Sequence, residues 1–164
     1  MDRPLLAAAC IAVLVAAPAF AQPGLTATEQ AAAFEAAGFV LQGGEWHSDC
    51  GDPGTSSYTA GAIDTVRDLN GDGRPEAVIT EGSTYCYGNS GVGYAIVGKQ
   101  ANGSWRKIAG GTGIPSFLPT KGVAGWPDIE IGGPGFCFPV ERWDGRGYVL
   151  NRHAYEGRPC KPPR

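Results

Sequence analysis

Glycine and proline recur at short intervals after residue 37 and divide the chain into short segments. The 26 glycines and 13 prolines among 164 residues favour tight turns over long helices. The dipeptides Asn102-Gly103 and Asp144-Gly145 are typical of β-hairpin turns, because both residues take positive φ at little cost. The sequence therefore predicts an all-β domain of short antiparallel strands.

One helix is predicted before these strands. Thr26 or Thr28 can cap a segment that runs to Ala37, and Gly38 is a typical stop signal. Its apolar face consists only of Phe34 and alanines, so we expect the helix to pack on the outside of a sheet. The predicted strands are residues 39–46, 62–67, 76–80, 93–99, 105–109, 128–131, 140–143 and 148–152.

Two stretches of the chain look like copies of each other. Each has a proline and a carboxylate, a strand, an aromatic-Cys-aromatic loop, a second strand, a hairpin turn and a third strand. The copies begin at Pro75 and Pro127, and their cysteines are Cys86 and Cys137. Two copies are too few to close a β-propeller, but they can pack as a small sandwich of two antiparallel, blade-like meanders, each of three or four strands. A chance likeness between two glycine-rich meanders is the alternative.

Residues 1–21 are typical of a cleavable signal peptide. Arg3 gives a positive start, residues 5–17 are uninterruptedly apolar, and Ala19-Phe20-Ala21 fits a small-x-small cleavage site. The apolar run is shorter than the roughly 20 residues of a transmembrane helix. An uncleaved anchor is the alternative. We expect export to the periplasm or the medium, with residues 22–164 forming a single disulfide-bonded β domain and no membrane span after cleavage.

Removal of the leader would also remove Cys10 and leave an even number of cysteines. An even number in a short exported chain predicts disulfides, because the compartment is oxidising. A zinc site is the alternative, but no two cysteines have the close spacing that such sites usually use. Three pairings are possible, with a preference for one bridge in each half. The remaining cysteines are Cys50, Cys86, Cys137 and Cys160.

The segment Asp68 to Glu76 matches a calcium-binding loop. Oxygen-bearing side chains stand at positions 1, 3, 5 and 9, and Gly73 at position 6 permits a sharp turn. The pattern is not an EF-hand, since position 12 is Ile79 and both flanks are strand-like. A polar turn without metal is the alternative. The predicted ligands are the side chains of Asp68, Asn70, Asp72 and Glu76 and the backbone carbonyl of Arg74, whose side chain would point away from the ion.

This loop between two strands resembles the calcium loops of FG-GAP and VCBS repeats, which occur in integrin-type β-propellers and in many bacterial secreted proteins. The resemblance rests on residues 68–76 and the strand that follows, and it implies the same five calcium ligands. Residues 121–126, which precede the second copy, contain no carboxylate, so only one such loop is present. The order of the whole chain also resembles small exported bacterial proteins of unknown function.

No catalytic constellation is expected. The two histidines, His47 and His153, lie far apart in sequence, and Ser48 belongs to no G-x-S-x-G motif. Nothing marks any carboxylates as an acid–base pair, and solvated surface is the simpler interpretation. The carboxylates considered are Asp49, Asp52, Glu81 and Glu130. We therefore predict that the protein is not an enzyme.

The aromatic rings beside the cysteines are the second predicted site. They either cover a disulfide or form an exposed recognition surface for a protein or carbohydrate partner. These rings are Tyr85, Tyr87, Phe136 and Phe138. A net charge of −3 gives no support for nucleic-acid binding. We expect a monomeric, non-catalytic binding module with structural calcium, and a small secreted hydrolase is the alternative.

Overall fold

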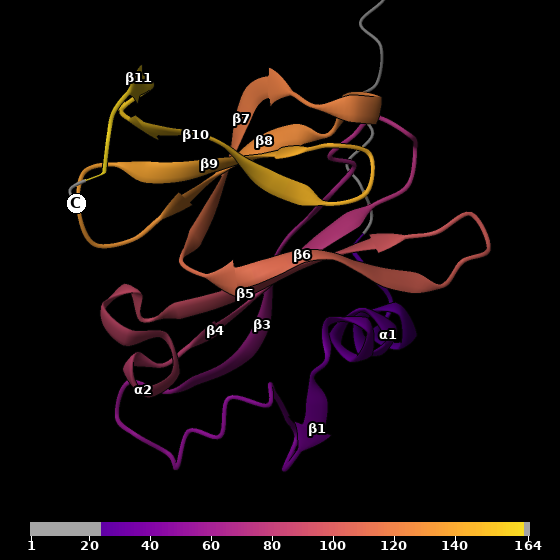
Figure 1. Cartoon of the computed structure of the whole chain (residues 1–164). Helices are drawn as coiled ribbons and strands as arrows, with labels where there is room; N and C mark the ends of the chain where they lie inside the picture. Colours follow the sequence, from indigo (N-terminus) through magenta and orange to yellow (C-terminus); the bar gives the residue numbers. More distant parts are fainter. Residues whose placement is uncertain (1–23, 163–164) are drawn as a thin grey trace, which may run out of the picture.

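The computed structural model describes residues 24–162 (Figure 1). The predicted signal peptide and Cys10 lie outside this range. The described part is mostly strand, in two antiparallel sheets, which confirms the all-β sandwich. No helix within residues 24–162 is long and apolar enough to cross a membrane.

The predicted N-terminal helix is confirmed as α1 (Ala27–Ala37). Thr26 caps it and forms a reciprocal pair of hydrogen bonds with Glu29, and Gly38 ends it at φ 96°. Ala33, Phe34 and Ala37 are the buried residues of the helix, and they pack against the first sheet.

The first sheet contains six strands in chain order. They are β1 (Val40–Gln42), β2 (Glu45–His47), β3 (Thr59–Arg67), β4 (Glu76–Gly82), β5 (Val92–Lys99) and β6 (Trp105–Thr112). The single strand predicted over residues 39–46 is wrong, because the chain turns at Gly43 and Gly44, both with positive φ, and forms the hairpin β1–β2. Two short helical segments, α2 (Thr84–Tyr87) and η1 (Gly88–Ser90), connect β4 to β5.

The second sheet contains five strands in the order β11-β10-β9-β8-β7. They are β7 (Ile114–Lys121), β8 (Pro127–Gly132), β9 (Phe138–Trp143), β10 (Tyr148–Tyr155) and β11 (Arg158–Pro159), with the 3₁₀ segment η2 (Val123–Gly125) before β8. The chain crosses between the sheets at Gly113, which has φ 126°. A Cβ there would lie 2.6 Å from the Gly132 carbonyl oxygen, so only glycine fits this crossing.

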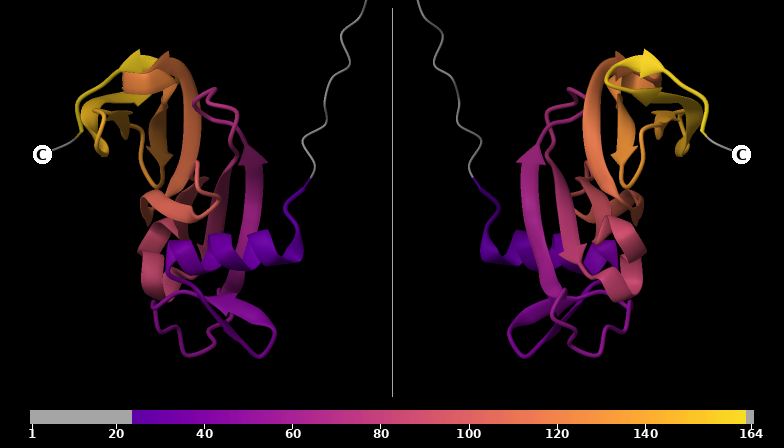
Figure 2. Two further views of the ribbon diagram at one scale, coloured as in Figure 1. Left: turned by 90° about the vertical axis from the view of Figure 1, so that its right-hand side faces the viewer. Right: turned by 90° about the vertical axis from the view of Figure 1, so that its left-hand side faces the viewer.

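The first sheet is buried on both faces. Ala77, Ile79 and Val97 pack against α1, whereas Val78 and Ile96 face the second sheet. Figure 1 shows the resulting three layers, with the second sheet above the first and α1 below. Figure 2 shows the same layers from the sides, with β1 and α1 at the end remote from β10 and β11.

The two sequence copies pack through opposite faces of their corresponding strands. When Pro75 is aligned with Pro127, Ala77 corresponds to Ile129. Ala77 faces α1, but Ile129 packs in the core between the sheets. The strand face that packs against α1 in the first copy therefore corresponds to the strand face that packs against the first sheet in the second copy. As a result, Glu76 lies toward the second sheet and Asp128 lies on the outer face.

Candidate functional site

The predicted calcium loop connects β3 to β4 and is wrapped around Asp68. The Asp68 carboxylate accepts hydrogen bonds from the backbone N–H groups of Gly71 at 2.7 Å and Gly73 at 2.8 Å. Asn70 accepts from the N–H of Asp72, and Asp72 accepts from that of Arg74, both at 2.9 Å. These local contacts explain why Asp, Asn and Gly alternate here.

Glu76 closes the loop at the start of β4 and is buried. Its Oε2 accepts a hydrogen bond from the Leu69 N–H at 2.7 Å. Burial raises the pKa of Glu76 to about 7, and the nearby carboxylates of Asp72 and Asp68 add to this effect. Glu76, Asn70 and Asp72 line a cavity of about 220 Å³.

Arg74 takes a different orientation from the predicted one. Its side chain does not point away from the loop: Nη2 lies 2.5 Å from Asp72 Oδ2, and Nε donates to the Lys99 carbonyl at 3.1 Å. Within residues 24–162, no three His, Cys, Asp or Glu side chains are grouped so as to hold a metal ion. The loop thus contains the predicted oxygen donors, and the Arg74 guanidinium forms an ion pair with one of them, Asp72.

Residues 121–126, the counterpart of this loop in the second copy, support it. Gly125 has φ 79°, and a Cβ there would lie 2.5 Å from the Asn70 carbonyl oxygen. Trp126 packs with Leu69 in the core between the sheets. The acidic loop is therefore part of the junction between the two sheets.

A second polar cluster surrounds Glu81 on β4, which is only 2% exposed. Its carboxylate accepts hydrogen bonds from the Ser48 N–H at 3.0 Å, the Tyr58 hydroxyl at 3.1 Å and the Tyr87 hydroxyl at 2.5 Å. The Ser48 hydroxyl also donates to it. Burial acts to raise the pKa of Glu81, but these hydrogen bonds outweigh it and the pKa is lowered.

His47 joins this cluster through Tyr58. The Tyr58 hydroxyl lies 2.5 Å from His47 Nδ1, and the two rings stack at 5.4 Å. A cavity of about 210 Å³ beside them is also lined by Ser48, Asp49, Asp52 and Glu81. No spacing in the sequence associates these residues, but the structure brings three of the four carboxylates named above, Asp49, Asp52 and Glu81, to one cavity. Glu130 lies apart, on β8.

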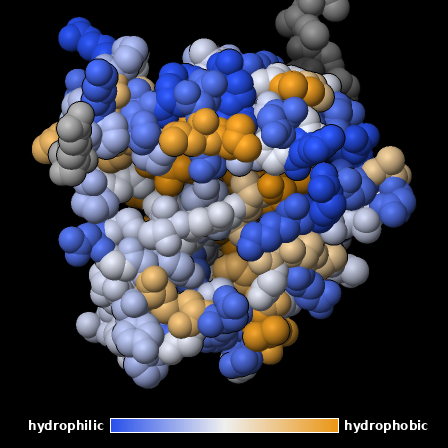
Figure 3. All heavy atoms as spheres, viewed as in Figure 1, coloured by the Kyte–Doolittle hydropathy of each residue, from blue (hydrophilic) through white to orange (hydrophobic). Residues whose placement is uncertain are grey.

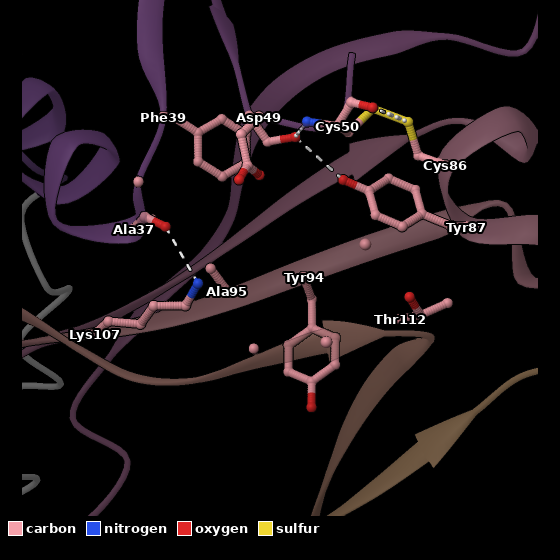
Figure 4. Close-up of a pocket in the computed structure, with 15 residues that line it drawn as sticks. Ala37, Phe39, Asp49, Cys50, Cys86, Tyr87, Tyr94, Ala95, Lys107 and Thr112 are labelled. Atoms are coloured by element: carbon pink, nitrogen blue, oxygen red, sulfur yellow. Dashed lines mark hydrogen bonds between the residues drawn. A yellow bond between two sulfur atoms is a disulfide. The ribbon is translucent and has the colours of Figure 1, made fainter. Parts of the chain in front are cut away.

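The segment Ser48–Cys50 also forms one wall of a larger cavity, of about 530 Å³. Figure 4 shows Tyr87 and the Cys50–Cys86 disulfide on one side of this cavity and Lys107, which donates to the Ala37 carbonyl at 3.3 Å, on the other. The second disulfide joins Cys137 to Cys160. The expected pattern of one bridge in each half is confirmed.

The four predicted recognition residues have different environments. Tyr85 is 65% exposed and Phe136 is 76% exposed. Tyr87 points to Glu81, while Phe138 packs on Tyr155 with ring centroids 5.9 Å apart. The two loops adjoin, because a Cβ built on Gly133 would lie 3.9 Å from that of Ser90. On the face seen in Figure 3, hydrophobic residues form separate groups among hydrophilic ones.

Comparison of the chain with protein-family models, with curated proteins and with solved structures finds no match. The resemblance to FG-GAP and VCBS calcium loops therefore rests only on residues 68–76 and the strand that follows, and it stays a prediction.

Proposed function

We propose that this protein is an exported binding module in which calcium has a structural role. The observation that carries the proposal is the pair of exposed rings, Tyr85 and Phe136, on two adjoining loops. Each loop is anchored by its own disulfide, which limits the entropy lost when a partner binds. Aromatic residues are enriched in such contacts, and the partner would be a protein or a carbohydrate. The disulfides are compatible with an oxidising compartment outside the cytosol.

The partner-binding role can be tested by capture from culture fluid or cell envelope. We expect the double variant Tyr85→Ser/Phe136→Ser to lose the captured partner, because the exposed rings are gone while the buried core is unchanged. Leu41→Ser is the matched control, since Leu41 is 58% exposed but lies on β1. Equal capture by the wild type and the double variant would contradict the proposal.

The donor set of residues 68–76 fits calcium in kind. Calcium is a hard cation that takes six to eight oxygen ligands, and the loop supplies carboxylate, amide and carbonyl oxygens from alternate residues. Glu76 adds a buried carboxylate that no Lys or Arg pairs with among the described residues. The ion would be held by Asp68, Asn70, Asp72, Glu76 and the Arg74 carbonyl. Binding would require the Arg74 guanidinium to leave Asp72.

Calcium is expected to raise the melting temperature. At 10 mM calcium and a Kd of about 10⁻⁴–10⁻³ M, typical of extracellular modules, the stabilisation is about 1.4–2.7 kcal/mol. Calorimetry with calcium and with chelator measures it. Asp72→Ala should abolish the difference, whereas Asp144→Ala, in a hairpin turn of the second copy, should retain it. Identical melting curves with and without calcium would remove the metal from the proposal.

A small hydrolase is the alternative function. It requires a histidine within hydrogen-bond reach of a Ser, Asp or Glu at a cavity, and His47 is linked to Glu81 through the Tyr58 hydroxyl. His47, with Tyr58 as its partner, is the residue that favours it.

A further inference from the structure

Two hydrogen bonds of the Tyr58 hydroxyl link Glu81 to His47, and together they determine which atoms carry the protons. Tyr58 has one hydroxyl proton, but its oxygen contacts both Glu81 Oε1 at 3.1 Å and His47 Nδ1 at 2.5 Å. An ionised carboxylate can only accept, so the Tyr58 proton must lie toward Glu81. The second contact then needs a proton from the imidazole. His47 is therefore protonated on Nδ1, and Nε2 of the neutral ring carries a free lone pair.

The surroundings of His47 allow Nε2 to act on a bound molecule. His47 lines the 210 Å³ cavity, and the charged groups around it are all acidic: Glu45 on β2 at 3.9 Å from Nε2, Asp49 and Asp52 in the following loop, and Glu81 behind Tyr58. None of the described residues that line the cavity is Lys or Arg. An anionic molecule is disfavoured there, whereas a neutral or cationic one is accepted.

From this geometry we propose that His47 is a general base, positioned by Tyr58 and Glu81, for hydrolysis of a small uncharged or cationic ester. This activity goes beyond the binding role and uses different residues. Ser48 is not the nucleophile, because its hydroxyl donates to Glu81 and accepts from the Cys50 N–H at 3.2 Å. Water therefore attacks: its oxygen bonds to the carbonyl carbon, its proton passes to Nε2, and the bond to the leaving alcohol or phenol oxygen breaks. The imidazolium then returns the proton to that oxygen or to solvent.

The tautomer is tested by ¹⁵N NMR of the histidine side chains in the disulfide-bonded protein at alkaline pH. We expect Nδ1 of His47 to carry the proton in the wild type, and Tyr58→Phe to move it to Nε2. His153, on β10, has no side-chain hydrogen bond or ion pair among the described residues, so it is the internal control and should not change. An unprotonated Nδ1 in the wild type would overturn the proposal.

The base role is tested with p-nitrophenyl acetate, a neutral activated ester. His47→Gln should lower the rate by about 10²-fold, and Glu81→Gln should lower it while the melting curve shows that the chain is folded. His153→Gln should leave the rate unchanged. A wild-type rate no higher than that of His47→Gln, or of buffer, would overturn the proposal even if the tautomer is as expected.

Discussion

Asp128→Ala is expected to lower the free energy of unfolding by about 3 kcal/mol. Asp128 is fully buried on β8. It accepts hydrogen bonds from Arg142 at 2.8 and 2.9 Å, from Arg152 at 2.7 Å and from Thr120 at 2.6 Å. Its removal leaves two neighbouring guanidiniums without their shared anion. This loss of unfolding free energy is at the low end for broken buried ion pairs, because both arginine side chains are partly exposed to water.

Urea unfolding measures this loss, and pH provides an independent check. Hydrogen bonds from Arg142 hold the pKa of Asp128 below its usual range. Its contribution is therefore fully present above the unfolded-state pKa and is lost as pH falls through the folded-state value. The variant should show a weaker acid dependence. Glu130→Ala, on the same outer face of β8, is the control and should change stability by less than about 0.5 kcal/mol. Equal effects of the two variants would exclude the ion cluster as a stabilising element.

Local signals were sufficient to predict most of the fold. The hairpin dipeptides, the capping residues of α1 and the alternation of apolar residues each act over a few positions. The sequence does not predict β7, because Pro115 and Pro119 weaken a strand prediction. The sheet order shows why they are tolerated: β7 is an edge strand, and an edge residue can lack an N–H donor.

The Glu81 cluster could not be predicted in the same way. Its donors come from positions 33 and 23 residues earlier in the chain, Ser48 and Tyr58, and from Tyr87 beyond the end of β4. No fixed spacing relates such residues, because the register of β3 against β4 and the course of the β2–β3 loop bring them together. The acidic loop is the opposite case, since all its hydrogen bonds around Asp68 span at most five residues.

Removal of the Cys50–Cys86 disulfide by a double alanine variant is expected to cost about 2–4 kcal/mol. The bridge closes a separation of 36 residues, and the Cys137–Cys160 bridge closes one of 23. Chain entropy alone makes the two losses differ by only about 0.4 kcal/mol. The Cys137→Ala/Cys160→Ala variant is therefore a matched control for stability.

The two variants should differ at the Glu81 cluster. The Cys50–Cys86 bridge joins the segment that carries Ser48 to the helix α2 that carries Tyr87, and both residues donate to Glu81. Without the bridge, the two segments are free to separate, Glu81 loses donors, and the hydrogen bond that orients His47 weakens. The ¹⁵N signals of His47 should therefore shift only in the Cys50→Ala/Cys86→Ala variant, although both variants lose similar stability. Unchanged ¹⁵N signals of His47 in the Cys50→Ala/Cys86→Ala variant would mean that β2 and β4 alone hold the cluster. The disulfide would then act only on the unfolded chain.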